Sequence, residues 1–118
     1  KQAVSDFVKL TEAQKAPFWK LYDEYELKRK DLGKQRIALL EQYAKDYQTL
    51  TSEQADAWTK KVMDLQKKTD NLISTYYGKI KAISDGIVAT QFFQIENYIL
   101  LAIRAEILSG IPFVQEKK

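Results

Sequence analysis

The side chains that most often carry out chemistry are scarce in this 118-residue chain. It contains no His and no Cys, so the commonest general base, the commonest transition-metal ligand and all thiol reactions are lacking. The carboxylates Asp23, Glu24 and Glu26 lie among lysines, a pattern typical of a solvated helix face. The sequence has no glycine-rich phosphate loop, no Ser-His-Asp set and no metal-ligand spacing. We therefore expect no enzyme, no metal site and no cofactor.

Four charged residues fall inside otherwise apolar stripes. Glu96 and Glu106 lie in the apolar C-terminal third, where we expect a structural ion pair to another helix rather than acid–base catalysis. Arg29 and Arg36 lie one heptad apart on one helix face. Either their stems pack at a helix edge while the guanidinium groups reach water, or they form a cationic surface with neighbouring tyrosines that binds a partner.

Two copies of one five-residue pattern mark the starts of helices. Leu10-Thr11-Glu12-Ala13-Gln14 and Leu50-Thr51-Ser52-Glu53-Gln54 share the form Leu-Thr-x-x-Gln. A Thr at the N-cap and a Gln three residues later form a capping box, which satisfies backbone N–H groups of the first turn. A degraded copy at residues 83–87 either starts a third helix at Ser84 or Asp85, or lies within one continuous helix.

The spacing of apolar residues predicts three helices, over residues 12–47, 52–81 and 85–109, the last one stopped by Gly110 and Pro112. The short link at 48–51 predicts that the first two form a long antiparallel hairpin. The second helix carries a heptad-like seam, in which we expect Trp58 to be core. The seam residues are Ala55, Trp58, Val62, Leu65, Thr69, Leu72, Tyr76 and Ile80.

The third helix is apolar over more than half of its circumference. Its two stripes are Val88, Phe92, Ile95, Ile99 and Ile103, and Phe93, Leu100 and Ile107. A helix of this kind needs neighbours on two sides, and one hairpin supplies one. We expect the remaining surface to be covered by a second subunit or to form a binding patch. Phe92 and Phe93 point about 100° apart, so at least one should meet another chain or an uncovered surface.

Composition limits the remaining classes. Four Gly and two Pro are too few for an all-β chain, so we predict an all-α, elongated single domain over residues 1–118. The net charge is +3, but acids are mixed with the bases, so we expect no nucleic-acid binding. The most apolar run, Tyr98–Leu108, is broken by Arg104 and Glu106. We therefore expect no membrane insertion.

With its two Leu-Thr-x-x-Gln boxes, at Leu10, Thr11 and Gln14 and at Leu50, Thr51 and Gln54, the chain resembles a divergent member of the Spy/CpxP-like family. The resemblance implies a periplasmic helical hairpin that forms a homodimer, with the signal peptide not present in this chain. It also implies an ATP-independent chaperone or envelope-stress adaptor that binds unfolded or partner proteins. The metal-sensing branch of that family uses His-rich ligand sets, which this chain lacks.

The alternative is a structural or regulatory interaction module without chaperone activity. For either function, the residues expected to bind proteins are Arg and aromatic side chains, which combine apolar area with polar contacts. They are Tyr22, Tyr25, Arg29, Arg36, Phe92 and Phe93.

Overall fold

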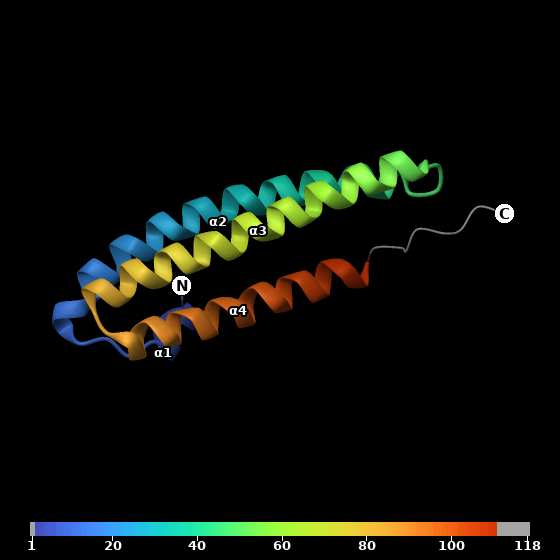
Figure 1. The fold of residues 1–118 in the computed structure, drawn as a ribbon. Coiled ribbons are helices and arrows are strands. Elements are labelled where there is room, and N and C mark those ends of the chain that lie inside the picture. Colours follow the sequence, from blue (N-terminus) through green and yellow to red (C-terminus); the bar gives the residue numbers. More distant parts are fainter. Residues whose placement is uncertain (1, 111–118) are drawn as a thin grey trace.

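The computed structural model describes residues 2–110, which form four helices and no strand (Figure 1). The helices are α1 (Gln2–Phe7), α2 (Glu12–Asp46), α3 (Ser52–Ile83) and α4 (Gly86–Ser109). The all-α prediction is confirmed, and the three long helices begin and end within two residues of the expected positions. The short helix α1 was not predicted. Pro112 lies outside the described residues.

The capping residues account for these boundaries. At α3, the Gln54 N–H donates to the Thr51 hydroxyl at 3.1 Å and the Gln54 side-chain oxygen accepts from the Thr51 N–H at 3.0 Å. At α2, the Gln14 side-chain oxygen accepts from the Thr11 N–H at 3.0 Å. Of the two alternatives for residues 83–87, the structure has a separate helix that starts after Asp85. The Asp85 carboxylate caps α4 by accepting from the Val88 N–H at 2.9 Å.

Helices α2 and α3 lie side by side and run in opposite directions (Figure 1). Tyr25, early in α2, contacts Tyr76, late in α3, with ring centroids 5.6 Å apart. Near the connecting loop, Tyr43 stacks on Trp58 with centroids 4.6 Å apart. Every residue of the predicted α3 seam is buried or half-buried. Trp58 is half-buried rather than fully in the core, because it lies near the exposed end of the pair.

Helix α4 lies below this pair and contacts α3 along its first turns, and α1 packs against α4 (Figure 1). The Lys9 N–H donates to the Gln91 side chain at 3.0 Å and ties the segment after α1 to α4. One core forms where these elements meet. It consists of Val4, Val8, Phe18, Tyr22, Tyr25, Ile73, Tyr76, Ile80, Val88, Ala89 and Phe92.

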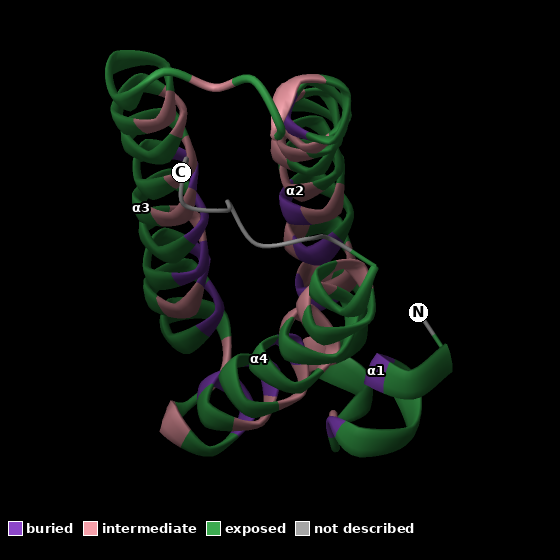
Figure 2. Cartoon of the chain, turned by 90° about the vertical axis from the view of Figure 1, so that its right-hand side faces the viewer, coloured by how far each residue is buried: buried purple, intermediate pink, exposed green. Residues whose placement is uncertain are grey.

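The core occupies one end of an elongated molecule. The extents are 62 × 21 × 19 Å and the radius of gyration is 17.6 Å, against about 13 Å for a compact chain of this length. Towards the other end, α4 is mostly exposed or half-buried, as the colours of Figure 2 show. The apolar C-terminal half of α4 is therefore not sealed inside the protein.

Candidate functional site: a cationic groove beside a buried ion pair

The first half of α4 is fixed by a buried carboxylate. Glu96 is fully buried and accepts from the hydroxyls of Tyr22 at 3.2 Å and Tyr25 at 2.9 Å. Arg29 Nη1 donates to the same carboxylate at 2.7 Å, and its other terminal nitrogen lies 3.4 Å from Glu26. An isolated buried charge would be costly, but this one has a cation and two further donors. Glu96 is therefore the predicted structural ion-pair residue between helices.

The surroundings of Glu96 keep the two tyrosines protonated. Burial, followed by the negative charge of Glu96, raises the pKa of the Tyr22 and Tyr25 phenols well above their ordinary value. Both phenols therefore remain hydrogen-bond donors at neutral pH. Because Glu96 has no exposed surface and its acceptors are occupied, the cluster holds α4 to α2 and offers no open position for a substrate.

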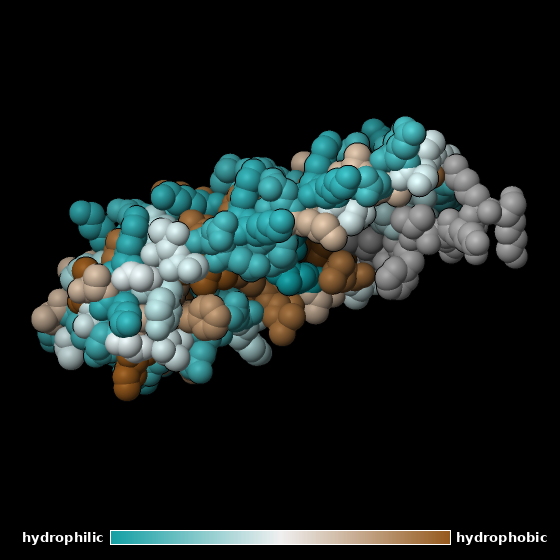
Figure 3. Space-filling view, viewed as in Figure 1, coloured by the Kyte–Doolittle hydropathy of each residue, from teal (hydrophilic) through white to brown (hydrophobic). Residues whose placement is uncertain are grey.

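Beyond this cluster, α2 and the second half of α4 enclose an open groove with a cavity volume of about 520 Å³. Thr69 of α3 lines its floor, and isoleucines and leucines line its walls. Two of these wall residues stay well exposed, with Ile37 at 50% and Ile103 at 47%. On the face drawn in Figure 3, where α3 lies in front of α2, apolar side chains gather between the hydrophilic surface of α3 and α4. We call this cavity the α2–α4 groove.

The charged side chains that line the α2–α4 groove are all cations, namely Arg29, Lys30, Lys34, Arg36 and Arg104. Arg36 donates to the Gln66 side chain at 2.9 Å. Burial, followed by the charge of Arg104, lowers the pKa of the Arg36 guanidinium from its ordinary value. The Arg104 Nε is buried and has no hydrogen-bond partner among the described residues. The groove therefore combines apolar walls with a local excess of positive charge.

The residues expected to bind proteins separate into two groups. Tyr22, Tyr25 and Phe92 are buried in the core around Glu96, so their role in binding other proteins stays a prediction. Their aromatic area is used inside the chain, where the Phe92 ring packs against both tyrosines at centroid distances of 6.3 and 5.3 Å. They hold α4 in place, and of the three Tyr22 alone also lines the groove described above.

The other three of these residues retain exposed surface. Arg29 lies at the boundary between the buried cluster and the groove, and Arg36 lines the groove. Phe93 is 42% exposed and packs edge-on against Tyr77, with centroids 6.3 Å apart. Their role in binding remains a prediction. Leu10, Thr11, Gln14, Leu50, Thr51 and Gln54 lie at the starts of α2 and α3, as the capping pattern predicts.

Sequence reasoning missed Arg104 as a partner of Arg36. A signal was available, because neither arginine has an acidic residue three or four positions away on its own helix. Exposed lysines elsewhere do have one, such as Lys60, which lies 2.9 Å from Asp56. When an arginine in an apolar stripe has no acidic residue one turn away, any ion-pair partner must come from outside its own helix.

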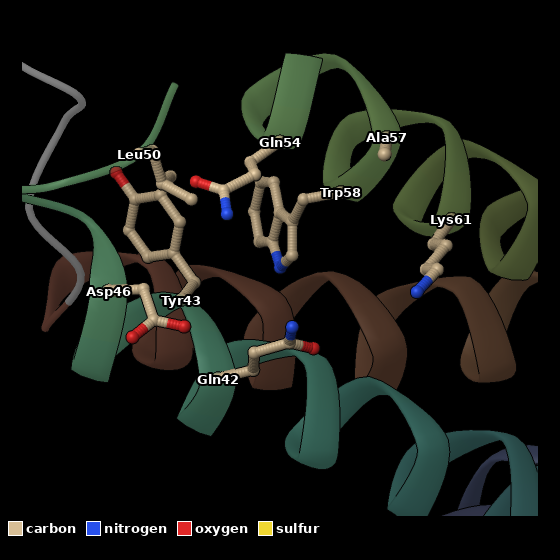
Figure 4. Close-up of a pocket in the computed structure, with 8 residues that line it drawn as sticks. All are labelled: Gln42, Tyr43, Asp46, Leu50, Gln54, Ala57, Trp58 and Lys61. Carbon is tan, nitrogen blue, oxygen red and sulfur yellow. The ribbon is translucent and has the colours of Figure 1, made fainter. Parts of the chain in front are cut away.

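A second, smaller pocket lies at the loop end of the α2–α3 pair (Figure 4). The Tyr43 and Trp58 rings lie at its centre, and the Trp58 indole N–H donates to the Leu39 carbonyl at 2.9 Å. Its volume is about 140 Å³, below the 300 Å³ or so at which small-molecule pockets begin. The stacked rings close the open end of the helix pair, and the α2–α4 groove remains the candidate site.

The described residues include no cluster of metal ligands and one helix that is apolar enough to span a membrane. No group of three carboxylates able to hold a metal ion occurs among residues 2–110. Helix α4 is long and apolar enough to cross a membrane, with a mean hydropathy of 1.3 over its most apolar 18-residue window. Core helices of soluble proteins also reach such values, and 22% of this window is buried inside the protein.

The fold and site define an elongated all-α protein with an apolar, cationic groove. No protein-family model, no curated protein and no solved structure matches the chain.

Proposed function

We propose that this protein binds apolar segments of other proteins without ATP, as a periplasmic chaperone or envelope-stress adaptor does. The observation that carries the proposal is the α2–α4 groove, in which Ile37 and Ile103 remain half exposed between cations. The periplasmic location and the chaperone class rest on the two capping boxes that resemble the Spy/CpxP-like family.

The groove suits capture of flexible chains for two reasons. Buried apolar area supplies affinity, at about 25 cal/mol per Å², and slows dissociation. Cations around the groove accelerate encounter with acidic segments. No nucleotide is needed for either effect, and we propose a binding protein rather than an enzyme.

We further propose that the α2–α3 pair acts as a rigid hairpin and that two copies form a homodimer through the outer face of α4. This outer face consists of Ile87, Tyr98, Leu101 and Leu108, each more than half exposed. Exposed apolar side chains that share one side of a helix on a small monomer are typical of an interaction surface. Since the groove lies on a different side of α4, a dimer formed in this way leaves it open to a client.

Suppression of aggregation of an unrelated denatured protein tests the proposal. We expect suppression by the natural chain and a clear loss in Ile103→Glu, because a carboxylate would occupy the apolar wall. Met63→Glu is the matched control, since Met63 on α3 is also exposed but lies outside the groove. No suppression at severalfold excess would contradict chaperone activity.

Small-angle scattering of the natural chain and of Leu101→Glu tests the proposed dimer. We expect the natural chain to have the mass of a dimer and the variant to have the mass of a monomer.

The second candidate is a regulatory module that docks one specific protein. The outer face of α4 favours it, because a fixed apolar stripe on a helix is a typical docking surface for a folded partner. A pull-down that yields one stoichiometric partner, lost in Leu101→Glu and retained in Ile103→Glu, would support this function over the chaperone.

A further inference from the structure

Part of the positive charge that lines the α2–α4 groove has no ion-pair partner among the described residues. On the outer surface, Lys60 and Lys68 each lie within 3.3 Å of an aspartate one turn earlier. In the groove, Arg29 and Lys30 are paired with Glu26 or Glu96. Among the described residues, no carboxylate lies within ion-pair distance of Lys34, Arg36 or Arg104.

Arg36 of α2 and Arg104 of α4 line the α2–α4 groove from its two walls. The charge of Arg104 disfavours the charged form of Arg36, so the two guanidinium groups repel each other. Gln66 accepts a hydrogen bond from Arg36 and donates one to Asp70 at 3.1 Å. The charge of Asp70 favours the charged form of Arg36, but Asp70 does not lie within ion-pair distance of it. The buried Nε of Arg104 has no acceptor in the described part of the chain. One anion shared by the two guanidinium groups would offset the repulsion between them.

The shape of the groove restricts what can bring that anion. The groove is long, because the α2 residues that line it extend from Tyr22 to Ile37, a span of about 22 Å. Apolar side chains from both helices line this length, which fits a single extended alkyl chain.

We propose that the α2–α4 groove binds a fatty acid as its carboxylate anion, with the head group between Arg36 and Arg104. The alkyl chain lies along Ile103, Ile99 and Leu32 towards Tyr22. Arginine donates paired hydrogen bonds that match the two oxygens of a carboxylate. This is a lipid-binding function, separate from the capture of protein segments.

Isothermal titration with sodium dodecanoate below its micelle concentration tests the proposal. We expect saturable binding with one molecule per chain. Dodecyltrimethylammonium carries the same tail with the opposite charge and should bind at least about tenfold more weakly. Octanoate should also bind more weakly, by about twofold for each missing methylene, because the groove is partly open and a fully buried methylene contributes about fourfold.

Variants locate the head group. Arg104→Gln and Arg36→Gln should each weaken dodecanoate binding by about tenfold, which equals about 1.4 kcal/mol. Lys60→Gln removes the same charge from the outer surface and should leave the affinity unchanged. Circular dichroism of each variant establishes that the helices are retained.

Other results would overturn the inference. Equal binding of the carboxylate and the ammonium compound would mean that the walls bind any apolar tail. Equal weakening by Lys60→Gln would mean that net charge alone attracts the anion, and absence of dodecanoate binding would exclude the site. Tighter binding of an acidic apolar peptide that displaces bound dodecanoate would assign the groove to protein segments. Because aggregation suppression is measured without fatty acid, failure of the chaperone proposal and failure of this one are distinguishable.

Discussion

The two halves of α4 carry similar apolar residues but lie in different surroundings. In the first half, Val88, Ala89, Phe92 and Glu96 are buried. In the second, Ile103 is half exposed although it follows Ile99 on the same helix face. The difference lies in α2, whose tyrosines contact Phe92 and Glu96, whereas Gly33 and Ile37 line the wall across from Ile103. The reach of the opposing side chains, rather than the apolarity of α4, determines which half is sealed.

The largest expected effect comes from the adjacent phenylalanines. Phe92→Ala should lower the free energy of unfolding by about 3–5 kcal/mol, because it opens a cavity between two tyrosine rings. Phe93→Ala should cost about 1 kcal/mol, since Phe93 is partly exposed. Urea unfolding of both variants measures the difference. Equal losses would contradict the contrast between the buried and exposed faces of α4.

The next effect concerns the buried ion pair. Glu96→Gln keeps the volume but removes the charge that accepts from Arg29 and two phenols. We expect a loss of about 2–3 kcal/mol in unfolding free energy, the range for a hydrogen bond to a charged group. Glu106→Gln on the exposed part of the same helix is the control and should change stability by less than about 0.5 kcal/mol. An unchanged free energy of unfolding in Glu96→Gln would mean that the cluster around Glu96 does not fix α4.

The buried phenols predict a dependence on alkaline pH. The pKa of Tyr22 and Tyr25 is raised in the folded state, so the unfolded chain releases their protons first. Stability from this source is fully present below about pH 10 and is lost as pH rises above it, by about 1 kcal/mol per phenol at pH 11. Urea unfolding from pH 9 to 11 measures the slope.

Two phenylalanine variants serve as controls for this slope. Tyr25→Phe should reduce it, because one of the two protons is then missing from both states. Tyr98→Phe should not, because Tyr98 is exposed. A slope unchanged by Tyr25→Phe would show that other groups cause the alkaline loss.

The smallest effect is expected in the open half of α4. Ile103→Ala should cost less than about 1 kcal/mol, because little of the side chain is removed from water. Ile80→Ala, at a fully buried position of α3, should cost about 2–5 kcal/mol. Thermal unfolding of the two variants sharpens the comparison, and a large loss in Ile103→Ala would indicate that the groove is closed in solution.

Local signals in the sequence predicted the helices well. The boundaries of α2 and α3 follow from hydrogen bonds between residues three apart, at Thr11 and Gln14 and at Thr51 and Gln54. The α3 seam follows from helical periodicity. The six-residue α1 was missed because so short a helix has no period to detect and depends on packing against α4.

The candidate site was predictable only in part, because it depends on contacts between distant residues. Glu96 and Arg29 are 67 positions apart, and nothing in either helix specifies which residue opposes it. For the same reason, the sequence suggested Tyr22, Tyr25 and Phe92 as surface residues, whereas docking of α4 buries them. Arg36 and Arg104 line the same groove because of the direction in which α4 crosses α2.

Gly33 lies in the wall of the α2–α4 groove, and an added Cβ there would meet nothing within 4 Å. Alanine at this exposed helical position would stabilise α2 by about 1 kcal/mol. Glycine therefore makes α2 less stable than alanine would, although there is space for the alanine side chain. Bulkier residues at the same position would narrow the channel by degrees without touching its arginines. A series of substitutions at position 33 therefore narrows the groove in steps. The side-chain size at which binding is lost gives the width that a bound molecule requires.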